Sequence, residues 1–94
     1  MVVVLEVFEG ERVNLLERYD YPMKGNVARI HYAKHGQPNG VVLESGEFIH
    51  LRPHGMAAIG VGVGAKVSAK GELRMTVLGT RMLEAHHANG HDIE

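Results

Sequence analysis

The sequence contains no cysteine and no tryptophan, and its aromatic side chains are limited to two phenylalanines and three tyrosines. Without cysteine the chain can form no disulfide, no thiolate nucleophile and no zinc site that includes a Cys ligand. The shortage of aromatic residues means that any surface on which bases stack must be small.

The chain also lacks an excess of charge of either sign. Ten Lys and Arg residues stand against eleven Asp and Glu residues, which gives a formal net charge of −1. A protein that coats nucleic acid through bulk charge is therefore excluded, and any binding of that kind must be local. Seven histidines make the surface more positive in mildly acidic solution.

No long hydrophobic run is present. The start, Met1–Glu6, lacks a basic region and soon reaches a carboxylate, so it predicts neither a signal peptide nor a membrane span. We therefore expect no membrane partner and a cytoplasmic location. A chain of 94 residues is too short to divide its apolar surface between two cores, which predicts a single domain over residues 1–94.

The N-terminal region predicts an accessory β-hairpin over residues 1–22. Val2–Phe8 is β-branched and aromatic, a Glu-Gly-Glu turn follows, and Tyr21-Pro22 is expected to end the unit. A short helix over 11–19 is the competing interpretation. If Val2–Phe8 is not covered within one chain, it would pair with a second copy, so a homo-oligomer formed through this strand is a further expectation.

Residues 25–88 carry strand patterns separated by turn residues. Residues 26–34 alternate, which places Ala28, Ile30 and Tyr32 on the face opposite Val27. A two-residue Ser45-Gly46 turn would pair Val42 with Ile49, so that Val42, Ile49 and Leu51 form an apolar side. One helical turn from Pro53 and strands at 65–70 and 81–87 complete the pattern.

This order predicts an all-β fold, a five-stranded OB-like Greek-key barrel over 25–88 with the added N-terminal hairpin. Short strands with many glycines would leave exposed edges in an open sheet, and closure removes them. Lys34–Met56 also resembles a family of small, functionally uncharacterised bacterial proteins with an OB-like domain. The resemblance continues loosely through 63–71 and 84–90. It implies the fold but no established activity.

OB domains bind oligonucleotides or oligosaccharides on their second and third strands and the flanking loops. Cations there would follow phosphates while aromatic rings stack on bases. The sequence therefore predicts a non-enzymatic module that binds single-stranded nucleic acid without a cofactor, and a solvated strand face is the alternative. The candidate ligand-binding residues are Arg29, Tyr32, Lys34, Phe48, His50 and Arg52.

Two other functions remain open. His50, His54 and His87 could hold zinc, nickel or copper if the last strand lies beside Pro53, which would make the protein a metal sensor or carrier. A structural adaptor that binds protein through its first strand is the other. Catalysis is not expected, since no Gly-x-Ser-x-Gly surrounds Ser45 or Ser68, and Gly60–Gly64 lacks the Lys-Ser/Thr of a phosphate loop.

Overall fold

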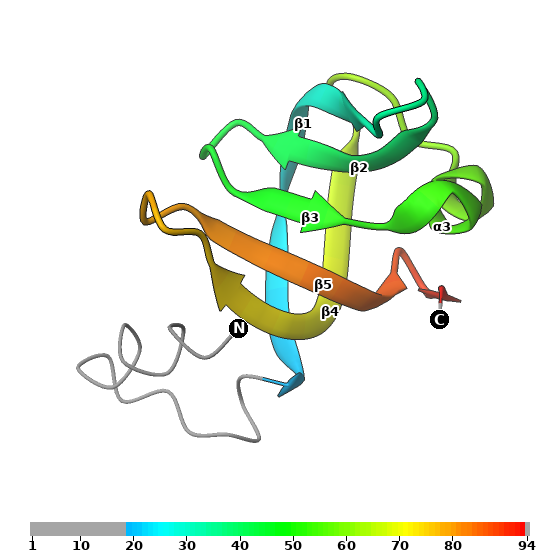
Figure 1. The fold of residues 1–94 in the computed structure, drawn as a ribbon. Coiled ribbons are helices and arrows are strands. Elements are labelled where there is room, and N and C mark those ends of the chain that lie inside the picture. Colours follow the sequence, from blue (N-terminus) through cyan, green and yellow to red (C-terminus); the bar gives the residue numbers. More distant parts are fainter. Residues whose placement is uncertain (1–18, 94) are drawn as a thin grey trace.

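The computed structural model describes residues 19–93. The predicted hairpin over 1–22, including the strand at residues 2–8, falls almost wholly outside the described residues. The elements, drawn in Figure 1, are β1 (Tyr21–Tyr32), β2 (Pro38–Leu43), β3 (Phe48–His50), α3 (Arg52–Ile59), β4 (Lys66–Met75), β5 (Arg81–Ala88) and β6 (His91–Asp92).

The strands close into a barrel. β1 pairs with both β2 and β4, β2 pairs with β3, and β4 pairs with β5, all in antiparallel fashion. A parallel pairing of β3 with β5 completes the ring in the order β1-β2-β3-β5-β4, and the short β6 is added beside β5. The predicted all-β barrel is confirmed.

A row of inward side chains crosses all five strands of the barrel. Its members are direct cross-strand neighbours, and four of them are completely buried while the fifth packs partly against the core. Because side chains alternate between the two faces of a strand, the residues on either side of this row point outward. The row consists of Ile30, Val41, Ile49, Leu83 and Leu73.

Strand β1 differs from its prediction in two ways. It begins at Tyr21 rather than near Gly25, so Tyr21-Pro22 opens a strand instead of ending one. Pro22 is tolerated because this half of β1 pairs with β4 alone among the described strands, and no second ladder needs the missing donor. A bulge at Ala28 also shifts the register, so Val27 and Ile30 both reach the core.

The β2–β3 hairpin is also offset from its prediction by one residue. Val42 pairs with Phe48 and Val41 pairs with Ile49. Gly46 takes a left-handed φ of 95°, and its N–H donates to the carbonyl of Leu43, which lengthens the loop beyond two residues. A one-residue slip exchanges the faces of a strand, so Val41 and Leu43 are buried whereas Val42 lies on the outside.

Paired threonine substitutions test this register. Val41→Thr places a hydroxyl in the core and is expected to lower the free energy of unfolding by about 1–3 kcal/mol. Val42→Thr lies on the outer face and is expected to change that free energy by less than about 0.5 kcal/mol. Urea unfolding followed by circular dichroism measures both values. Equal losses, or a larger loss at Val42, would favour the predicted register instead.

Helix α3 and the C-terminal residues meet at one end of the barrel (Figure 1). The predicted single turn from Pro53 is a helix of 8 residues that starts at Arg52. Met56 and Ile93 are both buried, and the Nε2 of His54 donates to the carbonyl of Ile93 at 2.6 Å. No helix in the described part of the chain is long and apolar enough to span a bilayer.

Candidate nucleic-acid interface

Two rows of outward side chains flank the inward row, and together they form what we call the outer face. Each row crosses the strands in the order β1, β2, β3, β5, β4, so it brings together side chains that are far apart in the sequence. The first row is Arg29, Val42, Phe48, Met82 and Arg74, and the second is His31, Gly40, His50, Glu84 and Glu72.

Three rings lie close together on this face. The centroids of the Phe48 and His31 rings are 4.7 Å apart, and those of Phe48 and His50 are 6.1 Å apart. Gly40 gives the Phe48 ring its space, because a Cβ at Gly40 would approach Phe48 Cε1 to 2.8 Å and would also contact the carbonyl oxygen of Ile49. The result is a short strip of aromatic surface with histidine at each end.

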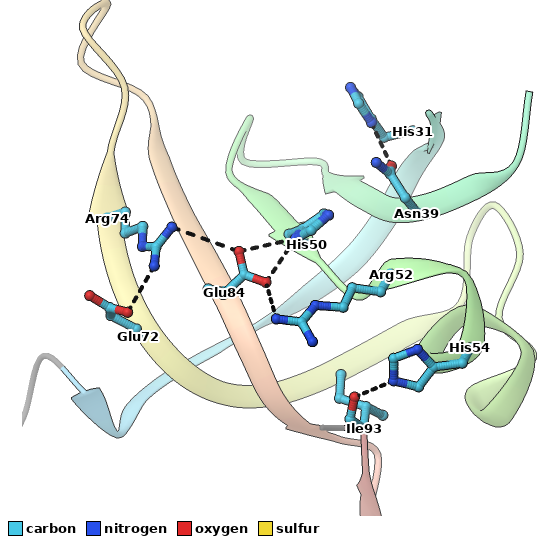
Figure 2. A network of polar contacts seen from close by, with 9 residues as sticks. All are labelled: His31, Asn39, His50, Arg52, His54, Glu72, Arg74, Glu84 and Ile93. Atoms are coloured by element: carbon cyan, nitrogen blue, oxygen red, sulfur yellow. Dashed lines mark hydrogen bonds and ion pairs between the residues drawn. The ribbon is translucent and has the colours of Figure 1, made fainter. Parts of the chain in front are cut away.

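A carboxylate on β5 organises the cations beside this strip, as Figure 2 shows. The His50 Nδ1 donates to Glu84 at 2.8 and 3.0 Å from its two oxygens. The Nη2 of Arg52 lies 3.4 Å from the same carboxylate, and the Nη1 of Arg74 lies 4.0 Å from it. The Glu84 side chain is only 13% exposed, so this carboxylate forms the partly buried centre of the cluster.

Arg74 connects Glu84 to a second carboxylate. Its Nη2 donates to Glu72 at 3.0 Å. Arg52 and Arg74 are therefore balanced by Glu84 and Glu72. The cluster is therefore close to neutral and does not form a patch of uncompensated positive charge.

Arg52 sits at a strained point of the backbone. Its φ of 65° lies in the left-handed region, which costs a non-glycine residue about 1–2 kcal/mol. The turn lets the chain pass from β3 into the helix, where Pro53 occupies the first turn and needs no donor. Half of the Arg52 side chain remains exposed, so the side chain is accessible to a ligand from solvent.

The structure brings four of the six predicted ligand-binding residues to this side of the barrel. Arg29, Phe48 and His50 belong to the outer face, and Arg52 reaches it through Glu84. Tyr32 instead lines an apolar groove against Pro53 and Met56 of the helix region. Lys34 is exposed in the loop between β1 and β2.

The residues that sequence reasoning missed are Glu84, Arg74, Glu72 and Asn39. The alternation of residues 81–87 could have placed Glu84 on the outside of its strand, but nothing in the sequence indicates that β5 lies parallel to β3. Asn39 is bound to His31, whose Nδ1 lies 2.8 Å from the Asn39 Oδ1.

The predicted metal ligands are not brought together. His50 is bound to Glu84, His54 is bound to the Ile93 carbonyl, and His87 pairs across the sheet with Lys70 and Asp92. Within residues 19–93 there is no group of three or more His, Asp or Glu side chains arranged to hold a metal ion.

Comparison of the chain with protein-family models, with curated proteins and with solved structures found no match. The residues of the site themselves therefore indicate which ligands it can bind. It offers stacking rings, exposed guanidinium and ammonium groups, and imidazole nitrogens.

Proposed function

We propose that this protein is a non-enzymatic module with an OB fold, and that its outer face binds single-stranded nucleic acid weakly. The strand order around the barrel and the helix between β3 and β4 support the OB assignment. OB domains bind oligonucleotides along their second and third strands, which here correspond to β2 and β3. A cytoplasmic location is part of the same proposal.

The strip formed by His31, Phe48 and His50 carries this proposal. Base stacking on such rings contributes about 1–3 kcal/mol per base. It tolerates any nucleotide sequence because every base has a flat face. Phe48 is the largest of the three rings and is half-buried, so it can hold a base without moving first.

The cations around the strip are the groups that would contact the phosphates of a bound strand. Arg29 and Lys34 are exposed, and neither forms an ion pair with a carboxylate among residues 19–93. Arg52 is shared with Glu84 but keeps exposed donors. Because so few cations are uncompensated, we expect weak binding at low salt, with a logarithmic affinity that falls only gradually as salt increases.

Fluorescence anisotropy with a labelled oligothymidine of about 15 nucleotides tests the proposal, since one OB fold covers roughly 4–16 nucleotides. Arg29→Ala is expected to weaken binding about tenfold at low salt, because a charge-assisted hydrogen bond contributes about 1.5–3 kcal/mol. Phe48→Leu keeps an apolar side chain over Gly40 but removes stacking, and it should weaken binding by a similar factor.

Lys70→Ala is the matched control, because Lys70 is an exposed cation on β4 that belongs to neither row of the outer face. It should leave the affinity within about twofold, a difference of roughly 0.4 kcal/mol. No change in anisotropy at low salt for the unmodified protein would refute the proposal. Equal losses for Arg29→Ala and Lys70→Ala would show that binding is not confined to the outer face.

A further inference from the structure

A separate hollow lies on the N-terminal half of β1 and the first half of β4. Figure 1 shows these two strands side by side behind β2, β3 and β5. The hollow has a volume of about 470 Å³, and no residue of the outer face lines it. Its polar lining residues are Lys24, Asn26, Lys66, Ser68 and Asn89.

Strand alternation builds the hollow. Lys24 pairs with Ser68 and Asn26 pairs with Lys66, and these side chains point away from the core. The pair between them, Gly25 and Val67, faces inward, where Val67 is 1% exposed. Two short polar side chains thus lie diagonally between two long basic ones, which leaves space above the strands.

Asn89 fixes the rim. Its Oδ1 accepts the Ser68 N–H at 2.9 Å, and its Nδ2 donates to the Lys66 carbonyl at 3.3 Å. Asn89 also adopts a left-handed φ of 49°. These bonds satisfy the free edge of β4 with a side chain, so the strand that carries both Lys66 and Ser68 is held in place.

The described residues do not neutralise the charge at this hollow. Lys24 and Lys66 are exposed, and among residues 19–93 neither forms an ion pair with a carboxylate. Lys70, two positions beyond Ser68 on β4, also points outward and adds a third ammonium group on the same side of the strand. In a chain whose formal net charge is −1, this is a local excess of positive charge.

We infer that this hollow binds a small molecule that carries a phosphate group. Two ammonium groups can share a doubly charged phosphate, and the Ser68 hydroxyl can donate to one of its remaining oxygens. The Asn26 Nδ2 donates one N–H to the Gly64 carbonyl at 3.4 Å and keeps its second N–H for another oxygen. The volume exceeds that of phosphate alone and falls in the usual range for small-molecule sites, so the phosphate is expected to bear an organic group.

Amide chemical shifts of the full chain test the inference. Titration with adenosine 5′-monophosphate and with inorganic pyrophosphate should shift the amides of residues 24–26, 66–68 and 89, whereas uncharged adenosine should not. Lys24→Ala/Lys66→Ala should weaken both titrations about a hundredfold or more, since each of the two lost charge-assisted bonds contributes about tenfold or more.

Arg29→Ala/Lys34→Ala is the control, because it removes the same charge from the outer face and from the neighbouring loop between β1 and β2. It should weaken oligothymidine binding and leave the two small-molecule titrations unchanged, so this inference and the proposed function fail independently. The inference is overturned if neither phosphate compound shifts these amides at millimolar concentration, or if both double variants weaken the titrations equally. A response of the hollow to oligothymidine alone would also overturn it.

Discussion

Replacing Gly71 with alanine is expected to lower the free energy of unfolding by about 3 kcal/mol. A Cβ at Gly71 would collide with the carbonyl oxygen of Glu84 and would lie 2.7 Å from the Cα of Ala85. Both are backbone atoms of β5, so no side-chain rotation can relieve the contact, and the two strands would have to separate.

The position matters because β4 curves strongly to remain in the barrel, as Figure 1 shows. The register between β4 and β5 shifts between Lys70 and Gly71, and at Gly71 the backbone of β5 leaves no room for a Cβ. A glycine at such a corner allows this close approach of the two strands. Both rows of the outer face run from β5 to β4, so separation of these strands would also disrupt that face, and the variant should lose oligothymidine binding together with stability.

Gly62→Ala provides the control for Gly71→Ala. A Cβ at Gly62 would meet nothing within 4 Å, so this variant should stay within about 0.5 kcal/mol of the unmodified protein. Urea unfolding of the two variants measures the difference. If Gly71→Ala were as stable as Gly62→Ala, the close contact between β4 and β5 at Gly71 would be contradicted.

The barrel could be predicted from sequence because its strands carry a local signal. Apolar residues recur at every second position in segments such as 66–70 and 81–87, with glycine and polar residues at the turns between them. These patterns decide which segments are strands. Closure then follows from the need to cover the edges of short strands.

The register could not be predicted with the same certainty, because single residues decide it. An extra residue at Ala28 and a longer loop at Gly46 each reverse the faces of the residues beyond them. For this reason the prediction placed Val42 on the apolar side with Ile49, whereas the structure places Val41 there. The choice between the two depends on how the hairpin packs against β1 and β5, which is not a local property.

The candidate site was predicted in part for the same reason. Phe48 and His50 lie on a strand whose outward positions are visible in the sequence. The carboxylate that binds His50 and Arg52 comes from β5, which becomes their neighbour only through a parallel pairing. Sequence reasoning therefore described His50 and Arg52 as available for a ligand, whereas the structure shows them sharing Glu84.

Glu84→Gln is expected to change stability and binding in opposite directions. The variant loses the charge that His50, Arg52 and Arg74 surround, which should lower the free energy of unfolding by about 2 kcal/mol. The same change leaves both guanidinium groups without their shared carboxylate, so oligothymidine should bind several-fold more tightly. Removing one internal anion should steepen the logarithmic salt dependence by about 0.7.

Glu44→Gln separates this local effect from a change in total charge. Glu44 is exposed at the hairpin turn and makes no ion pair with a residue of the described chain. Glu44→Gln changes the net charge by the same amount as Glu84→Gln, but it should leave the free energy of unfolding, the affinity and the salt dependence nearly unchanged. Anisotropy at several salt concentrations and urea unfolding give all three quantities.

The direction of the change in affinity decides what Glu84 does. Tighter binding by Glu84→Gln together with lower stability means that the carboxylate competes with phosphate for Arg52 and Arg74. Weaker binding means that Glu84 instead holds His50 and Arg52 in the geometry that a ligand needs, because loss of that geometry outweighs the gain in positive charge. That result would contradict the hypothesis that the carboxylate competes with the phosphate backbone, although the outer face would remain the binding surface.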